Sequence, residues 1–345
     1  MGFVQTFAKV LSLALSIGMR PVERAAQAQD LLKGTPLAGA SVELVGRGLK
    51  LGLIVGTALA ADGSVLLVDR GESRVLRVRP DGTLMATFGG PGDGPGEFRF
   101  PYRVAELSDG SVIVYDLAIR RFSEFGPTGK FRRRWSTSVD IATLDDVVPL
   151  DKRGFAISGI LKDPKAGHSA VHVFDSTFQL VQSFGELPPS KSRVLLEQWG
   201  AGSLLTTSNG NLLFTRRIPY ELYWFTPRGE RQRFIKVPRP VSEGADVGFL
   251  VRSDGATVTT EVRKDVAYPL SAAPLPGGHI LAARMAGQEK FWDLVDEGGK
   301  LLWSGKAPTC LNYFIGSDEA RNTLWFMGDV EEEPVLYRIR PARNP

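Results

Sequence analysis

The chain is poor in the residues that form covalent and metal-linked frameworks: its 345 residues include one cysteine, Cys310, and three histidines. A single cysteine excludes an intramolecular disulfide and a zinc site built from cysteines, so we expect Cys310 to be a buried thiol. His168 and His172 lie four residues apart, a spacing that brings two metal ligands together only on a helix. On a strand they would be about 13 Å apart, so no two-histidine zinc site is expected.

Several sequence motifs are also missing, and each missing motif argues against a class of function. No apolar run approaches the ~20 residues that cross a bilayer, so we expect no membrane span. The sequence contains no Gly-x-Ser-x-Gly motif, which leaves a serine hydrolase of the nucleophile-elbow type unsupported. The glycine-rich segment 89–96 is followed by neither a Lys-Ser/Thr pair nor a predicted helix, and Pro91 and Pro95 remove amide donors. It therefore predicts a connecting loop and not a phosphate site.

The N-terminal 28 residues differ from the rest of the chain. Lys9 precedes an apolar stretch over residues 10–19, and Ala26-Gln27-Ala28 offers a small-residue cleavage site. This arrangement predicts a signal peptide over residues 1–28, and hence a periplasmic or extracellular protein. A short N-terminal helix, a disordered N-terminus or a start at Met19 are the alternatives, and each of them would leave the protein in the cytoplasm.

Glycine, by contrast, is abundant, with 38 residues, and it marks a repeat. Three features recur at an offset of 47 residues, which pairs Asp62-Gly63 with Asp109-Gly110, Asp69 with Asp116, and Gly82 with Gly129. Asp-Gly suits tight hairpins because both residues tolerate positive φ. Apolar and β-branched runs flank each turn, so one unit is predicted to form four antiparallel strands, the content of one propeller blade.

The same rhythm continues more weakly towards the C-terminus, and it predicts an all-β fold: a six-bladed β-propeller with four-stranded antiparallel blades in a single domain over residues 29–345. The expected blades are blade 1 at about 53–88, blade 2 at 103–135, blade 3 at 145–184, blade 4 at 202–236, blade 5 at 267–304, and blade 6 at 312–340 with 41–45.

The last unit, residues 312–340, supplies only three strands. Because an incomplete blade would expose unpaired strand edges, we expect the N-terminal strand 41–45 to complete the C-terminal blade and close the ring. Seven blades are the alternative, if residues 237–266 form an irregular blade and not an insertion.

The first two blades and the link between them carry the most specific motif. Its residues are Phe88-Gly89-Gly90, Gly92 to Phe98, Pro101, Asp109-Gly110, Val114-Tyr115-Asp116, Arg121-Phe122 and Phe125. A glycine-rich segment ending in Phe and Pro, an Asp-Gly turn, a strand ending in Asp and an Arg-Val pair make up the repeat of the NHL family, which this segment resembles. Phe122 departs from the repeat, since Val is usual there.

The chain also resembles the six-bladed propellers of exported bacterial proteins. Both resemblances imply the propeller fold and a binding role. NHL-like propellers include protein binders, RNA binders and a few enzymes, so the resemblance does not decide the function.

Loop lengths predict which end of the propeller binds ligands. The turns from first to second and from third to fourth strands are short and share one face. Longer connections are expected on the opposite, long-loop face, where binding sites usually lie, at residues 89–102, 185–201, 236–265 and 328–333. The candidate ligand contacts near strand ends on this face are Asp69, Arg70, Asp116 and Arg120. The alternative for the two aspartates is a hydrogen bond to the following loop backbone. For the two arginines it is a solvated side chain.

These features favour an exported, non-catalytic scaffold that binds a protein, peptide or glycan through the long-loop face, without a cofactor and as a monomer. The alternative is a lactonase- or lyase-type propeller enzyme that depends on calcium or zinc. Asp69, Asp116 and Glu221 are conceivable calcium ligands, but no matched Glu-Asn-Asp set stands at equivalent strand ends.

RNA binding is a distant third prediction, and nucleic acid is not an expected partner. The basic segments 130–135 and 228–236 lie on predicted outer strands, where positive charge prevents edge-to-edge pairing without any ligand. The formal net charge of the whole chain is only +4.

Overall fold

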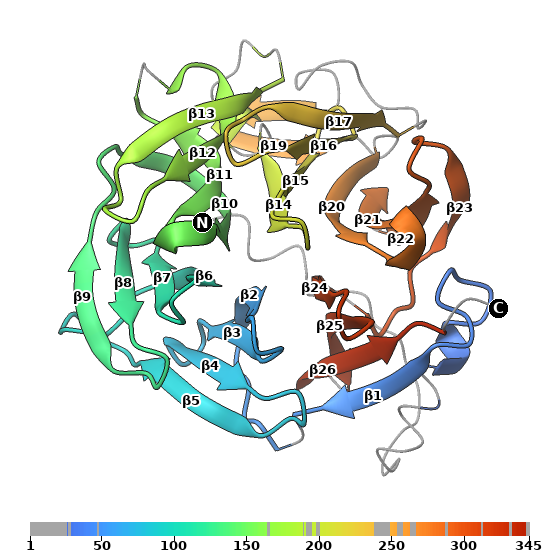
Figure 1. Ribbon diagram of the computed structural model, residues 1–345, viewed down its shortest axis with the longest axis horizontal. Helices are drawn as coiled ribbons and strands as arrows, with labels where there is room; N and C mark the ends of the chain where they lie inside the picture. The colour runs from blue at the N-terminus through green and yellow to red at the C-terminus, as the bar shows by residue number, and fades with distance from the viewer. Residues whose placement is uncertain are drawn as a thin grey trace.

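The computed structural model places six four-stranded antiparallel sheets in a ring (Figure 1). The arrangement is a six-bladed β-propeller and confirms the predicted fold class. The structure describes residues 26, 29–46, 48–163, 166–188, 190, 195–197, 201–237, 249–253, 258–262, 267–286, 289–311, 313–330 and 333–342. The predicted signal peptide lies outside these residues, apart from Ala26. Within them, no helix is long and apolar enough to cross a membrane.

Blades 1 to 3 follow one another along the chain, each running from its innermost to its outermost strand. Blade 1 consists of β2 (Ile54–Leu59), β3 (Val65–Asp69), β4 (Arg74–Val78) and β5 (Leu84–Gly89). Blade 2 consists of β6 (Pro101–Glu106), β7 (Val112–Asp116), β8 (Arg121–Phe125) and β9 (Phe131–Trp135). Blade 3 consists of β10 (Ile141–Pro149), β11 (Phe155–Leu161), β12 (Ser169–Phe174) and β13 (Leu180–Glu186), with the short 3-10 helix η1 (Asp151–Arg153) in its first turn.

Blades 4 to 6 repeat the pattern. Blade 4 consists of β14 (Gly202–Thr206), β15 (Leu212–Arg216), β16 (Glu221–Phe225) and β17 (Arg231–Lys236). Blade 5 consists of β20 (Ala267–Pro274), β21 (Ile280–Ala286), β22 (Glu289–Val295) and β23 (Leu301–Lys306), with η4 (Pro276–Gly278) in its first turn. Blade 6 consists of β24 (Tyr313–Asp318), β25 (Thr323–Val330), β26 (Glu333–Arg340) and β1 (Ser41–Val45).

The ring is closed by β1, which is the outermost strand of blade 6 (Figure 1). It pairs antiparallel with β26, with Ser41 opposite Arg340. Glu43 forms ion pairs with both Arg338 and Arg340 on that strand. The N-terminal strand thus completes the C-terminal blade, as the three-strand remainder of the sequence predicted.

Residues 237–266 contribute no seventh blade among the described residues. Their two strands, β18 (Phe249–Ser253) and β19 (Val258–Val262), follow blade 4 in the chain and form a separate two-stranded sheet. The segment 328–333 was expected to be a long loop, and this was wrong. Residues 328–330 extend β25 by pairing with residues 333–335 of β26, so the two strands pair over most of this segment.

Repeated Asp-Gly turns shape the hairpins within the blades, and aromatic residues pack the blades against one another. Asp62 Oδ1 accepts a hydrogen bond from the Ser64 amide at 2.8 Å, and Gly63 has φ +84°, the conformation that a hairpin of this type requires. Buried aromatic rings then join neighbouring blades: the Phe88 and Phe125 centroids, from blades 1 and 2, are 5.7 Å apart. The core therefore lies between the sheets, leaving the innermost strands to line the channel.

Candidate functional site

The two ends of the channel differ. At the short-turn end, Ser208 Oγ donates a hydrogen bond of 2.6 Å to Glu319 Oε2. These residues belong to the first turns of blades 4 and 6, so the contact skips blade 5 and narrows this end. The long-loop end instead receives the links between blades, including residues 90–100 and 187–201. A ligand is therefore expected to approach from the long-loop face.

Asp69 and Asp116 end β3 and β7 and are fully buried. Asp69 accepts hydrogen bonds from the Gly52 amide at 3.1 Å and from Arg74 Nη2 at 3.2 Å. Asp116 accepts four backbone amides, two from the incoming link and two from the following loop: Arg99, Phe100, Ala118 and Ile119. Both carboxylates therefore hold loops together at equivalent positions. Their role as ligand contacts stays a prediction.

Arg70 and Arg120, the other two predicted site residues, lie on the loops that follow these strands. The Arg70 guanidinium lies over the Phe100 ring at 4.5 Å. This cation–π contact stabilises the positive charge of Arg70 within the protein. Arg120 is exposed and has a positive φ of 52°. The four predicted residues thus mark the long-loop ends of blades 1 and 2, and Phe100, which contacts both Arg70 and Asp116, lies between the two blades.

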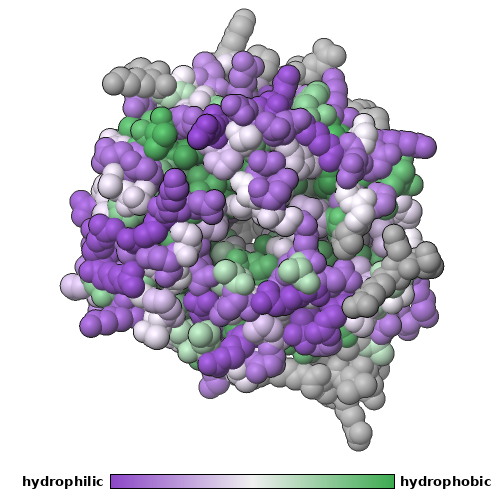
Figure 2. Space-filling model, in the orientation of Figure 1, coloured by the Kyte–Doolittle hydropathy of each residue, from purple (hydrophilic) through white to green (hydrophobic). Residues whose placement is uncertain are grey.

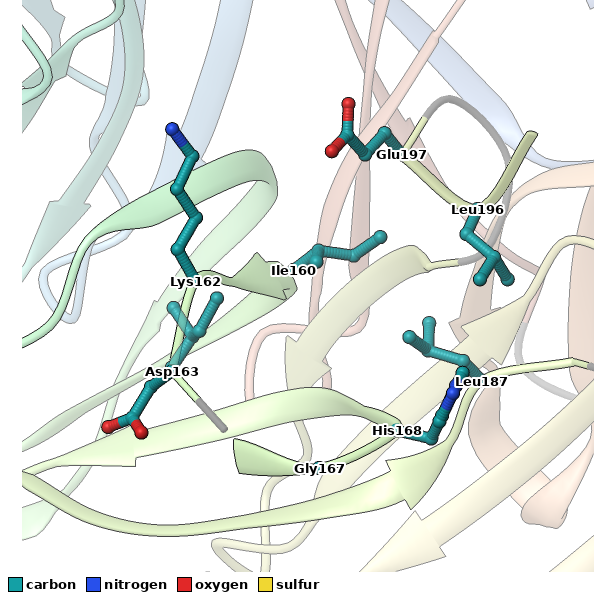
Figure 3. A pocket seen from close by; sticks show the side chains of 9 residues that line it. Ile160, Lys162, Asp163, Gly167, His168, Leu187, Leu196 and Glu197 are labelled. Atoms are coloured by element: carbon teal, nitrogen blue, oxygen red, sulfur yellow. The ribbon is translucent and has the colours of Figure 1, made fainter. Parts of the chain in front are cut away.

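A pocket of about 480 Å³ opens on the long-loop side of blade 3 (Figure 3). It lies between the β11–β12 loop and the link from β13 to β14. Nine residues line it: Ile160, Leu161, Lys162, Asp163, Gly167, His168, Leu187, Leu196 and Glu197. Its volume lies in the range of small-ligand sites.

The pocket combines an apolar floor with charged groups. Leu187 and Leu196 are about nine-tenths buried or more, and Figure 3 shows Ile160 extending towards them. Lys162 and Glu197 carry opposite charges at the same opening, and none of the nine lining residues is Phe, Tyr or Trp. The pocket therefore suits a ligand that has both aliphatic and charged groups.

The two neighbouring histidines have separate surroundings. His168 is exposed at the pocket, whereas His172 is fully buried, with Nδ1 2.8 Å from Ser183 Oγ and Nε2 3.3 Å from the Gly159 carbonyl oxygen. Burial lowers the pKa of His172 to about 4, because no water solvates the imidazolium form. His172 is therefore a neutral core residue.

A second polar cluster lies in the channel, and we call Tyr102, Arg103, Asp145, Asp146 and Arg217 the throat cluster. An irregularity in pairing occurs at the same rung of four innermost strands, and in β6 and β10 it falls at Tyr102 and Asp145. A β-bulge redirects side chains and is common beside functional sites. This rung is near the start of β2 and β6 and in the middle of β10, while Arg217 follows β15 on the long-loop face, so the cluster lies towards the long-loop end of the channel.

Arg103 spans three blades. Its Nε donates to the Asp145 carbonyl oxygen at 2.5 Å, and its Nη1 donates to the Val55 carbonyl oxygen at 2.7 Å. Its guanidinium also covers the Tyr102 ring at 4.0 Å. From the neighbouring blade 4, Arg217 Nη2 donates to Asp145 Oδ1 at 3.1 Å. The cluster therefore ties blades 1 to 4 together around the throat.

The carboxylate of Asp146 has no hydrogen bond to a charged group of the throat cluster. Its Oδ2 accepts from the Leu204 amide at 3.3 Å, while its Oδ1 lies 3.9 Å from Arg103 Nε, beyond hydrogen-bond distance. Burial within the ring, reinforced by the charge of Asp145, raises the pKa of Asp146 to about 6, although Arg103 opposes this shift. About 31% of its side chain is still accessible from the channel.

A metal site has little support in the part of the chain that is described, where no group of three His, Cys, Asp or Glu side chains converges. Glu221, the third conceivable calcium ligand, accepts a hydrogen bond from the Tyr223 hydroxyl at 2.7 Å and pairs with Arg216. Asp69 and Asp116 are occupied in the loops of other blades. The described residues therefore bring these three carboxylates to no common point.

The three arginines of the basic segment 130–135 have hydrogen-bond or ion-pair partners within the protein. Arg132 and Arg133 pair with Glu124, and Arg134 Nη2 donates to the carbonyl oxygens of Gly94 and Glu97 in the link between blades 1 and 2. These contacts give the positive charges a structural role at the outer edge of blade 2.

Comparison with known proteins identifies the architecture. No model of a known protein family and no curated protein matches the sequence. A solved structure provisionally described as an exported protein of Bacteroides fragilis matches with a TM-score of 0.58 at 12% identity, covering 89% of this chain and 97% of the other. A Xanthomonas campestris gluconolactonase matches with a TM-score of 0.52 at 15% identity, covering 92% and 93%.

Virginiamycin B lyase from Staphylococcus aureus gives a TM-score of 0.53 at 12% identity, covering 87% of this chain and 99% of the lyase. At such low identities these likenesses show the fold alone. The chain is a six-bladed β-propeller, and its neighbours within that class include both enzymes and a protein without a stated activity.

The throat cluster and the pocket were missed by reasoning from the sequence. Asp145 and Asp146 did give a signal, since two adjacent carboxylates interrupt an otherwise apolar strand. Arg103 and Arg217 gave none, because they come from different blades and meet Asp145 only in the closed ring.

Proposed function

We propose that this propeller is an exported, non-catalytic scaffold that binds a peptide segment of a partner protein on its long-loop face, over the blade 3 pocket. We further propose that blades 1 and 2 are NHL-type repeats. The observation that carries the proposal is the pocket itself, which two long connections form on the face where a ligand is expected to approach.

The pocket lining favours a peptide over a glycan. Aliphatic side chains such as Leu187 and Leu196 match apolar peptide residues, and the charges of Lys162 and Glu197 match ionic side chains or backbone dipoles. Sugar sites commonly use aromatic rings as stacking platforms, and the pocket lining has none of Phe, Tyr or Trp. Export is supported by the N-terminal pattern and by the exported protein among the structural neighbours.

A peptide library displayed on phage, selected against the full chain, tests the proposal. Affinities of selected peptides are then measured by fluorescence anisotropy. Because Lys162 is exposed at the pocket, Lys162→Glu is expected to weaken binding about tenfold or more without unfolding the protein, the effect of losing one good charged contact.

Lys130→Glu is the matched control, since it makes the same charge change at an exposed turn residue on the short-turn face. It should leave the affinity within about twofold. Equal loss in both variants would contradict the pocket assignment. Tightly bound calcium or zinc in the purified protein, together with lactone hydrolysis that a chelator abolishes, would instead favour the metal-dependent enzyme alternative.

A further inference from the structure

The throat cluster places an unused donor, Arg103 Nη2, near a carboxylate, that of Asp146, which the same guanidinium does not hydrogen-bond. Within the described part of the chain, Arg103 uses Nε and Nη1 for hydrogen bonds, while Nη2 donates to no atom. Asp146 Oδ1, 3.9 Å from Arg103 Nε, likewise lies beyond hydrogen-bond distance of that guanidinium. Both side chains are partly accessible, at 19% for Arg103 and 31% for Asp146, so solvent or a small ligand can reach both groups.

The charges around this point nearly cancel. Among the described residues, the titratable and charged groups facing Asp146 are Tyr102 and Arg103 from β6, Asp145 from its own strand and Arg217 from the β15–β16 loop. Strands β2 and β14 contribute only the backbone atoms of Val55 and Leu204. With both guanidinium groups and both carboxylates ionised, the net charge of the cluster is zero. It becomes +1 when Asp146 takes up a proton.

We propose that the throat is a carboxylate-binding site, in which a ligand carboxylate sits between Arg103 Nη2 and the acid form of Asp146. One ligand oxygen accepts from the guanidinium, and the other accepts the O–H that neutral Asp146 donates. The ionised form of Asp146 would repel the same ligand, since two carboxylates at hydrogen-bond distance cannot both stay charged without cost.

This site responds to mildly acidic pH. Since the pKa of Asp146 is raised to about 6, its acid form is a minor species at pH 7.5 and the major species at pH 5.0. If only the acid form binds, the apparent affinity for a carboxylate should rise roughly 30-fold between these two pH values. The proposal does not depend on the peptide pocket, which lies on other residues.

The experiment uses the full chain and two small probes, N-acetylglycine and its neutral isostere N-acetylglycinamide, in calorimetric titrations at pH 5.0 and 7.5. N-acetylglycine should bind at pH 5.0 and about 30-fold more weakly at pH 7.5. N-acetylglycinamide should bind weakly at both. D-Glucuronate, run alongside, distinguishes a sugar acid from a peptide C-terminus as the preferred source of the carboxylate.

The variant Asp146→Asn keeps a neutral donor at the site at every pH. It should bind N-acetylglycine at pH 7.5 about as tightly as the unmodified protein does at pH 5.0. Asp140→Asn is the matched control, because it removes one exposed charge just before the same strand. It should keep the pH dependence.

Three results would overturn the proposal: equal binding of N-acetylglycine at both pH values, equal binding of acid and amide, or an Asp146→Asn protein that folds and still binds poorly at pH 7.5. If Asp146→Asn does not fold, the pH dependence of the unmodified chain decides. Loss of peptide binding in Lys162→Glu with intact carboxylate binding would separate this site from the pocket.

Discussion

Asp69 and Asp116 show how single buried carboxylates organise the long loops. Each ends the second strand of its blade and accepts amide hydrogen bonds from the link that enters the blade: Gly52 bonds to Asp69, and Arg99 bonds to Asp116. A carboxylate has enough lone pairs to accept several such donors, whereas an amide or hydroxyl has fewer. The position therefore selects Asp for structural reasons, whether or not a ligand is also bound there.

Asp116→Ala is expected to lower the free energy of unfolding by about 3 kcal/mol, because it leaves four backbone amides without their acceptor in a buried site. Denaturant unfolding measures the change. Asp93→Ala is the control: it removes only an exposed partner of Arg99 and should change stability little. Unchanged stability in Asp116→Ala, with loss of ligand binding, would instead support Asp116 as a ligand contact.

His172 gives the fold a dependence on pH. Its pKa is lowered to about 4 in the folded protein, against 6.5 for the free side chain, so the unfolded chain binds more protons between these values. The stabilisation from neutral His172 is fully present above pH 6.5 and is lost as the pH falls through 4. By pH 4 the free energy of unfolding has decreased by about 3 kcal/mol from this group. His172→Gln should flatten this part of the stability profile, as measured by urea unfolding at pH 7 and pH 4. An equally steep profile in the variant would show that other groups cause the loss.

At the scale of elements, the strands follow from local patterns, while their irregularities depend on neighbours. The Asp-Gly turns and β-branched runs were sufficient to predict β3, β4, β7 and β8. The irregularities at Tyr102 and Asp145 were not predictable, because a bulge is defined only by the strand that pairs with it.

The prediction at the scale of elements concerns strand β1. Deleting residues 38–48 removes β1 and leaves β26 with a free edge, so we expect an unfolded or aggregated protein. Removing residues 1–28 should leave the thermal unfolding midpoint nearly unchanged. Circular dichroism and size-exclusion chromatography measure both outcomes, and a soluble, cooperatively folding 38–48 deletion would refute the closure.

At the scale of the whole molecule, the ring makes the two faces chemically different. One face carries only short turns, where Ser208 of blade 4 and Glu319 of blade 6 form a hydrogen bond, and the long connections surround the other face. Figure 2 shows a hollow at the centre of the ring on the face that it presents. The long-loop face thereby holds two separate features, the pocket on blade 3 and the throat cluster, which suits a partner that contacts the scaffold at more than one point.

The sequence by itself predicted the class of fold and the strand that closes the ring, whereas the choice of six blades over seven came from the structure. These properties follow from hydrophobic alternation, turn chemistry and the need to pair every strand edge, all of which are local or countable. Only the tertiary structure decided the site. Arg103, Asp146 and Arg217 belong to three blades, and their charges interact because ring closure brings the innermost strands within a few ångströms of one another.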